Sequence, residues 1–240
     1  MSEPRKRGYE SPLRQENAQA TRERIVAAAT ELMVGQGYSN TTMAEVAARA
    51  GVAVQTLYTS CPGGKPALAK MVYDTALGGD VQDIPQSSRP GVQAIIEETD
   101  VARKLAHYAA MASRIHQRVR PVLSVLRAAA AASSNDHGLQ AVVSDIERER
   151  LAGSRGPALH LQSLGALRAG LSAGRAAEQI YALTTIEIFD RLLDVCGWTE
   201  ADYEDWLSRM LVSALLGPNA TDDGPVAPEQ VGASDRHNPS

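Results

Sequence analysis

The sequence predicts an all-α fold. Hydrophobic residues make up 44% of the chain but aromatic residues only 4%, so the core must be built largely from Ala, Leu, Val and Ile. Ala and Leu lose little side-chain freedom in a helix. Apolar residues recur at helical spacing along most of the chain, and no segment has a convincing strand pattern. We therefore expect an N-terminal three-helix head followed by a larger C-terminal helical bundle.

The first helix is expected over residues 17–33, and Gly35 and Gly37 are suited to end it. Its apolar face follows the i, i+3, i+4, i+7 spacing of a half-buried helix and consists of Ile25, Ala28, Ala29, Leu32 and Met33.

Two short helices and a tight turn are expected next. Thr42 and Glu45 have the spacing of a capping box, and Gly51 supplies the turn about two helical turns later. The buried residues of the first short helix should be Met43, Val46, Ala47 and Ala50. The second, from about residue 53 to residue 60, should turn Leu57 inward. A fourth helix opens at Lys65 and Pro66, with an apolar face of Leu68, Met71, Val72 and Ala76.

The arrangement at residues 42–60 matches a helix-turn-helix, whose second helix fits a DNA major groove. The outward residues of that helix are Val54, Gln55, Thr56, Tyr58, Thr59 and Ser60. Gln55 can pair with adenine, Val54 and Thr56 can touch a thymine methyl, and the Tyr58 hydroxyl and Lys65 ammonium suit phosphates. Free amides at the helix that Thr42 caps form a further anion site. The alternative is a surface helix in a bundle that does not bind DNA.

Charge is distributed unevenly along the chain. Residues 1–72 hold nine Lys/Arg against six Asp/Glu, a net of +3, and residues 73–240 hold fifteen against twenty-two, a net of −7. A basic head on an acidic body is typical of a DNA-binding unit attached to a part that does not bind DNA. Residues 1–16 are expected to form a disordered basic arm, which either touches DNA or only adds solubility.

Long helices are expected beyond a Gly- and Pro-rich hinge. Their predicted ranges are 99–118, 121–133, 136–153, 157–169, 172–196 and 199–216, and Thr199 and Asp202 give the last one a capping signature. The predicted units are therefore the arm, a helix-turn-helix domain with its connecting helix at 17–78, a helical domain at 79–216, and a disordered tail at 217–240.

A longer pattern runs in register over residues 21–68. It consists of Thr21, Ile25, Ala28, Ala29, Leu32, Gly37, Tyr38, Thr41, Thr42, Met43, Glu45, Val46, Ala47, Ala50, Gly51, Val52, Thr56, Leu57, Tyr58, Lys65 and Leu68. This pattern resembles the signature of the tetracycline-repressor (TetR) family of transcription regulators. A less specific similarity, to one branch of that family, is carried by residues 167–172, 176–177, 181–184 and 197–198.

The resemblance implies a ligand-released repressor that acts as a homodimer on a pseudo-palindromic double-stranded DNA operator. It also places the groups at Thr42, Gln55, Thr56, Tyr58, Thr59, Ser60 and Lys65 at or near DNA. Three residues depart from the family pattern: Cys61 replaces a bulky residue, Pro66 a frequent Glu and Ala53 a frequent Ser. These departures bear on affinity rather than on the class of protein.

The last two predicted helices have wider apolar arcs than one core-facing stripe needs. A partner subunit would bury the surplus, and the resemblance implies a four-helix interface made by these segments of two chains. The alternative is a pair of central helices in a monomeric bundle. The predicted interface residues are Tyr181, Ile188, Phe189, Leu192, Trp206, Met210 and Leu211.

The resemblance further implies a small-molecule effector held among the middle helices. The candidate lining residues are Tyr108, Met111, Ile115, Leu126 and Arg150, and ordinary helix packing is their alternative. The effector would favour a state whose two heads are wrongly spaced for DNA. His107, His116 and His160 form no ligand-spacing cluster, so we expect no metal and no cofactor.

Other classes of protein are disfavoured. The charged N-terminus is not a signal peptide and no apolar run could span a bilayer, so with the distant cysteines Cys61 and Cys196 we expect a cytoplasmic protein. The chain has no Glu-x-x-His pair, activated nucleophile or phosphate-cradling loop, so we expect no enzyme. A helical small-molecule-binding or adaptor protein without sequence-specific DNA binding is the remaining alternative. For Cys61, a small buried apolar role is favoured over redox sensing.

Overall fold

The computed structural model describes residues 12–82 and 84–217. Within these ranges every regular element is a helix, apart from one isolated antiparallel bridge between Leu167 and Leu216. The all-α prediction is therefore confirmed. Residues 1–11 of the predicted arm and residues 218–240 of the predicted tail lie outside the described ranges.

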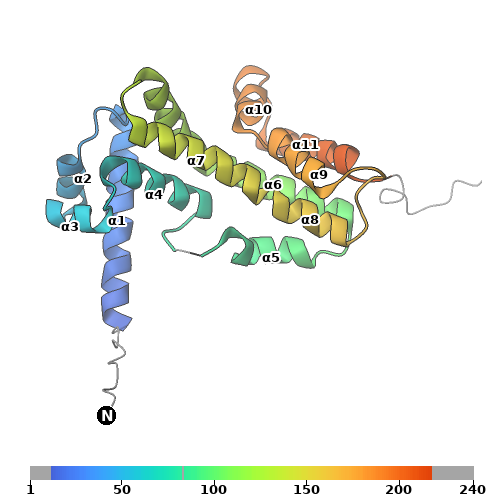
Figure 1. The fold of residues 1–240 in the computed structure, drawn as a ribbon, viewed down its shortest axis with the longest axis horizontal. Helices are drawn as coiled ribbons and strands as arrows, with labels where there is room; N and C mark the ends of the chain where they lie inside the picture. The colour runs from blue at the N-terminus through green and yellow to red at the C-terminus, as the bar shows by residue number, and fades with distance from the viewer. Residues whose placement is uncertain (1–11, 83, 218–240) are drawn as a thin grey trace, which may run out of the picture.

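The head consists of α1 (Pro12–Gln36), α2 (Met43–Ala50), α3 (Val54–Ser60) and α4 (Gly64–Gly78). Helix α1 begins earlier than predicted, so residues 12–16 are helical rather than part of an arm. The predicted inward residues of α2 and α3 are all buried. Figure 1 shows α2 and α3 packed beside α1 at one end of the molecule.

The body contains a short 3-10 turn, seven further helical segments of α type and one π-helical turn. In chain order they are η1 (Gln86–Ser88), α5 (Pro90–Glu97), α6 (Val101–Ala132), α7 (His137–Gly153), α8 (Arg155–Ser163), α9 (Ala173–Leu183), α10 (Ile186–Asp190), the π turn η2 (Arg191–Val195) and α11 (Glu200–Leu215). Helices α9 and α11 lie at the end opposite to the head (Figure 1).

The long helix α6 joins two hydrophobic cores. Its C-terminal half buries Val122 and Leu126 in a core shared with α1–α4 and α7. Its N-terminal half buries Leu105 and Ala109 in a second core with α8, α9 and α11. Because protein interiors are close-packed, a displacement of α6 or α7 must also displace residues of the head.

The expected helix break before Pro121 is wrong, because α6 runs through it without interruption. A proline inside a helix removes one backbone hydrogen bond. Pro121 lies on the exposed face, while Val119, Val122 and Leu123 on either side are almost fully buried. Burial of these neighbours offsets the missing bond and keeps the helix continuous.

Three other expectations about the body need correction. The predicted helix 172–196 is interrupted at Thr184 and Thr185, where α9 ends and α10 begins. The predicted helix 157–169 ends at Ser163, and Leu167 instead forms the bridge to Leu216. Helix α5 was not predicted, because its eight residues contain no fully buried side chain and follow a Pro-rich loop.

Candidate functional site

The turn between α2 and α3 is built by local hydrogen bonds. The Thr42 hydroxyl accepts from the Glu45 amide at 3.2 Å, and the Glu45 carboxylate accepts from the Thr42 amide at 2.9 Å. The predicted capping box is therefore present. Gly51 adopts a left-handed conformation with φ of 65°, which favours glycine, and ends α2. These bonds fix where α3 starts and which of its faces points outward.

Helix α3 presents its polar face to solvent as predicted. The exposed residues are Val54, Gln55, Thr56, Tyr58, Thr59 and Ser60, whereas Leu57 is fully buried. The Thr59 and Ser60 hydroxyls donate to carbonyls within the helix, to Gln55 and Thr56 respectively. Among the described residues, the side-chain amide of Gln55 and the Tyr58 hydroxyl have no hydrogen-bond partner. Their donors and acceptors are therefore available to DNA.

Lys65 lies in the first turn of α4, and its ammonium is already bonded. Its Nζ donates to the carbonyl oxygens of Tyr38, Ser39 and Thr41 at 3.0, 3.3 and 3.0 Å, and lies 4.3 Å from the centre of the Tyr38 ring. An ammonium has three donors, so these carbonyls use all of them. In this arrangement Lys65 holds the loop that leads into α2.

Arg24 is a candidate for the DNA interface that the sequence analysis missed. A Cβ built on Gly51 would lie 3.7 Å from its Nη1, so the guanidinium lies directly beside the helix-turn-helix turn. Among the described residues, its guanidinium donates a hydrogen bond only to the Thr21 hydroxyl, at 3.4 Å. Arg24 is far from Gly51 in the sequence, so no local sequence pattern points to it. The packing of α1 against α2 brings it to the turn.

Cys61 is 1% exposed, which fits the predicted role of a small buried residue. Burial raises the pKa of its thiol, and the nearby Arg22 charge opposes this only in part. A buried thiol that stays protonated is a poor nucleophile. The structure thus gives Cys61 a packing role in the corner after α3.

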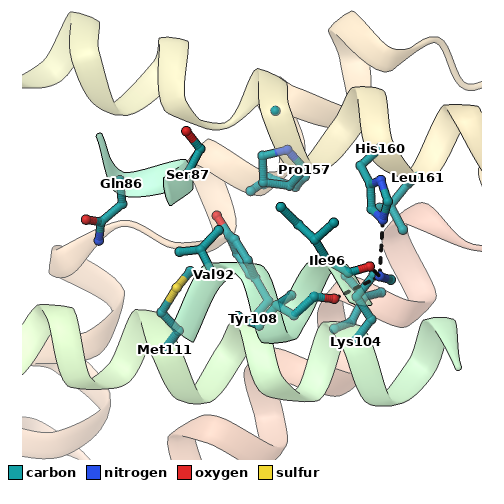
Figure 2. A pocket seen from close by; sticks show the side chains of 14 residues that line it. Gln86, Ser87, Val92, Ile96, Lys104, Tyr108, Met111, Pro157, His160 and Leu161 are labelled. Carbon is teal, nitrogen blue, oxygen red and sulfur yellow. Dashed lines mark hydrogen bonds between the residues drawn. The ribbon is translucent and has the colours of Figure 1, made fainter. Parts of the chain in front are cut away.

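A cavity of two adjoining chambers lies among α4–α9. The first has a volume of about 250 Å³ and the second of about 240 Å³, and Gln86, Tyr108 and Met111 line both. Figure 2 shows Gln86 and Ser87 at one end of the first chamber and Lys104 and His160 at the other. The Tyr108 hydroxyl has no hydrogen-bond partner among the described residues.

Four of the five predicted lining residues border these chambers. Tyr108 and Met111 line both, and Ile115 and Arg150 line the second. Leu126 lines neither, because it is fully buried in the core that joins the head to α6. The residues that the sequence analysis did not place here include Lys104 and Tyr73, whose position depends on packing between distant segments.

Polar groups of the second chamber converge on the break between α9 and α10. The Thr184 carbonyl accepts from Arg150 Nη2 at 2.9 Å and from His116 Nε2 at 3.0 Å. Because a carbonyl only accepts, the His116 proton is on Nε2, and Nδ1 accepts from the Tyr203 hydroxyl at 3.3 Å. Burial, helped by the Arg150 charge, lowers the pKa of His116 to about 4. The imidazole is therefore neutral at pH 7.

Helix α4 links the second chamber to the head. Tyr73 and Leu77 of α4 line the chamber, five residues and one residue before the helix ends at Gly78. Arg118 of α6 donates to the last carbonyls of α4, those of Ala76 and Leu77, at 2.9 and 3.0 Å. A molecule in this chamber would thus contact the helix that continues from the helix-turn-helix.

The predicted interface residues differ in burial. Phe189 and Leu211 are at most 1% exposed and pack inside their own subunit, which leaves no surface for a partner. Tyr181 is half-buried, and its hydroxyl donates to Glu147 at 2.8 Å. Half-buried side chains with apolar surface remaining are Ile188, Leu192, Trp206 and Met210. Val195, in the π turn, is 79% exposed.

Within the described ranges, no group of three or more His, Cys, Asp or Glu side chains could hold a metal ion. None of the described helices combines the length and the hydropathy that crossing a bilayer requires.

Residues 25–60 match the family described as bacterial regulatory proteins, tetR family. The matched stretch runs from the first buried residue of α1 to the last residue of α3 and includes the capped α2 and the Gly51 turn. The helix-turn-helix head is therefore a TetR-family domain. The chain is accordingly a DNA-binding transcription regulator with this head and a helical C-terminal domain.

Solved TetR-type structures share the fold over most of their length. TylP, a TetR regulator from Streptomyces fradiae, is 21% identical, with 84% of this chain and 89% of that one aligned and a TM-score of 0.59. NalD, the secondary repressor of the MexAB-OprM multidrug efflux pump in Pseudomonas aeruginosa, is 18% identical over 83% and 98%, with a TM-score of 0.57. FadR from Bacillus subtilis, in complex with stearoyl-CoA, is 19% identical over 79% and 97%, with a TM-score of 0.60. Among curated protein sequences, none matches the chain.

Proposed function

We propose that this TetR-family chain is a homodimeric repressor that binds a pseudo-palindromic operator and releases it when a small molecule occupies the internal cavity. The observation that carries the proposal is the position of Tyr73 and Leu77. Both line the second chamber, and both belong to α4, which continues from the helix-turn-helix. An effector that prefers a displaced α4 would shift the population of heads away from the DNA-binding arrangement.

The operator is read by α3. Gln55 offers a donor and an acceptor to a base, and Val54 and Thr56 offer methyl groups to thymine. Arg24, beside the turn, and the amides at the start of α2 supply phosphate contacts. Lys65 supports this interface indirectly, because its three carbonyl partners hold the chain segment that enters α2.

Two copies are held together by the face that α10, the π turn and α11 present. Ile188, Leu192, Trp206 and Met210 keep apolar surface on that face, and Val195 adds a largely exposed side chain. A two-fold pair would place the two α3 helices in successive major grooves, which explains why the operator should be pseudo-palindromic.

The test is binding to the DNA upstream of the chain's own gene, measured by fluorescence anisotropy at increasing salt. A specific binder should weaken steeply with salt and discriminate sequence. Gln55→Ala should relax the preference at one base position per half-site, at a cost of about 1–3 kcal/mol for the preferred base. Gln82→Ala, an exposed change in the hinge after α4, should leave binding unchanged. An unaltered base preference in Gln55→Ala would refute the assigned reading residue.

A further inference from the structure

We propose that the effector is an elongated apolar molecule with one negatively charged end, and that Lys104 binds that end. This rests on the proposed function, because it assigns a chemical class to the effector of the same cavity. The argument uses the shape of the first chamber and the charges that border both chambers.

The first chamber is apolar along its length and polar at its ends. Its apolar lining consists of Val92, Ile95, Ile96, Leu105, Met111, Pro157, Leu161 and Ile180. Figure 2 shows Val92, Met111, Tyr108 and Pro157 between the Gln86 end and the Lys104 end. With a volume of about 250 Å³ and this apolar lining, the chamber suits a short apolar chain.

Lys104 is a buried cation whose partners are all neutral. Lys104 is only 4% exposed, and its Nζ donates to the carbonyl oxygens of Ile95 and Ile96 at 2.8 and 2.7 Å. The third contact is His160 Nε2 at 3.1 Å, which must accept because an ammonium only donates. These neutral acceptors use all three donors, so a ligand carboxylate would take the place of His160 on Nζ. Burial lowers the pKa of Lys104, and the Glu98 charge opposes this only weakly.

The other charged side chains that line the two chambers already have ion-pair partners. Arg150 pairs with Glu147 at 2.9 Å, and Glu149 pairs with Lys70 at 2.9 Å. Among the described residues Lys104 forms no ion pair, and Glu98, the nearest acid, is bonded to Arg103. A buried charge without a counter-charge is unfavourable, so a ligand carboxylate at this end would complete the site. The same carboxylate elsewhere in the cavity would meet charges that are already matched.

The experiment compares octanoate with 1-octanol, which share a chain length and differ in charge, by calorimetric titration of the full-length protein. Octanoate should bind at least about ten-fold more tightly than octanol. Lys104→Met should abolish that preference while octanol binding persists, and Lys104→Arg, which keeps the charge, should retain it. Arg175→Met removes an exposed cation that pairs with Glu178 and lines neither chamber, and it should leave the preference unchanged. Circular dichroism of each variant checks that the fold is intact.

Equal affinity of the wild-type protein for octanoate and octanol would overturn the proposal, as would binding of neither. So would a preference for octanoate that survives in folded Lys104→Met, because the anion would then bind elsewhere. Each of these results leaves operator binding untouched. Failure of the wild-type protein to bind its upstream DNA would instead contradict the proposed function, whatever the ligand does.

Discussion

At the scale of single residues, His116 is the clearest case of a side chain whose protonation state is set by its surroundings. It is 6% exposed, donates to the Thr184 carbonyl and accepts from the Tyr203 hydroxyl, and its ring lies 5.2 Å from that of Phe189. The neutral form fits every one of these contacts, whereas an imidazolium would force the Tyr203 hydroxyl to turn from donor to acceptor and would place a charge in the core. The contacts that join α6, the α9–α10 break and α11 therefore favour the uncharged ring.

This arrangement predicts a loss of stability in mild acid. Since the folded pKa of His116 is about 4 and the unfolded value about 6.5, the unfolded chain binds more protons between these values. The free energy of unfolding should fall by about 2 kcal/mol from His116 alone as the pH drops from 7 to 5. Urea unfolding at the two pH values measures it. His116→Gln should reduce the pH dependence by that amount, and His107→Gln, an exposed change on the same helix, should not.

A second residue-scale contact joins the head to the body. A Cβ on Gly138, in the first turn of α7, would lie 2.8 Å from Pro66 Cγ at the start of α4. Replacing glycine by alanine inside a helix normally stabilises by about 1 kcal/mol. Here we expect Gly138→Ala to destabilise by about 1–3 kcal/mol, because the methyl group overpacks the contact.

Chemical unfolding tests this prediction together with Pro66→Ala, which should relieve the clash when both changes are combined. Gly35→Ala in α1 is the control, since nothing lies within 4 Å of its Cβ position. If Gly138→Ala proved as stabilising as Gly35→Ala, the close approach of α7 to α4 would be wrong.

At the scale of elements, helix starts are the features that local chemistry decides. Both α2 and α11 begin with a complete capping box, made by Thr42 with Glu45 and by Thr199 with Asp202. The two boxes have nearly the same geometry, with the amide of the fourth residue 3.2 Å from the threonine hydroxyl in each. They differ in position, because α2 packs against α3, the helix proposed to read DNA, whereas α11 lies in the body.

This pair gives a matched prediction. Thr42→Ala and Thr199→Ala should each lower the free energy of unfolding by about 1 kcal/mol, through loss of a cap. Only Thr42→Ala should also weaken DNA binding, because α2 sets the position of α3. Unfolding and anisotropy measurements on both variants check this. Equal loss of DNA affinity in the two variants would mean that global stability, and not the position of α3, controls binding.

At the scale of the whole molecule, α6 contributes to both hydrophobic cores and so connects the head mechanically to the body. The head-side core includes Leu139 and Ile146 of α7, and the other core reaches Leu215 near the end of α11. The proposed dimer face lies on that distant part of the body. The spacing of two heads in a dimer would therefore depend on the geometry of both cores.

The dimer proposal predicts that Leu192→Glu separates the subunits. A charge placed on the apolar face of the π turn would be buried without a partner in a dimer, whereas in a monomer it would be solvated. Light scattering after gel filtration should show a shift from dimer to monomer, with operator affinity reduced by at least about ten-fold. Arg191→Glu, on an exposed neighbouring position, should leave the mass unchanged. A wild-type protein that elutes as a monomer would contradict the proposal outright.

The sequence alone determined the helical class, the capped α2, the Gly51 turn and the outward face of α3. These features depend on residues within a few positions of one another, whose periodicity, capping and turn preferences act locally. The same reasoning explains why α7 and α11 were predicted within two residues of their ends. It also placed Tyr108, Met111, Ile115 and Arg150 among candidates for one cavity, with the resemblance to the family.

Only the tertiary structure decided which polar and apolar groups meet across long stretches of chain. It showed that the Lys65 ammonium is used by the loop before α2, that Phe189 and Leu211 are buried in their own subunit, and that Leu126 faces the core instead of the cavity. It also revealed the break at Thr184, whose carbonyl is satisfied by side chains from α6 and α7. Each of these outcomes depends on packing between segments distant in sequence, and helical periodicity carries no information about which segment supplies the partner.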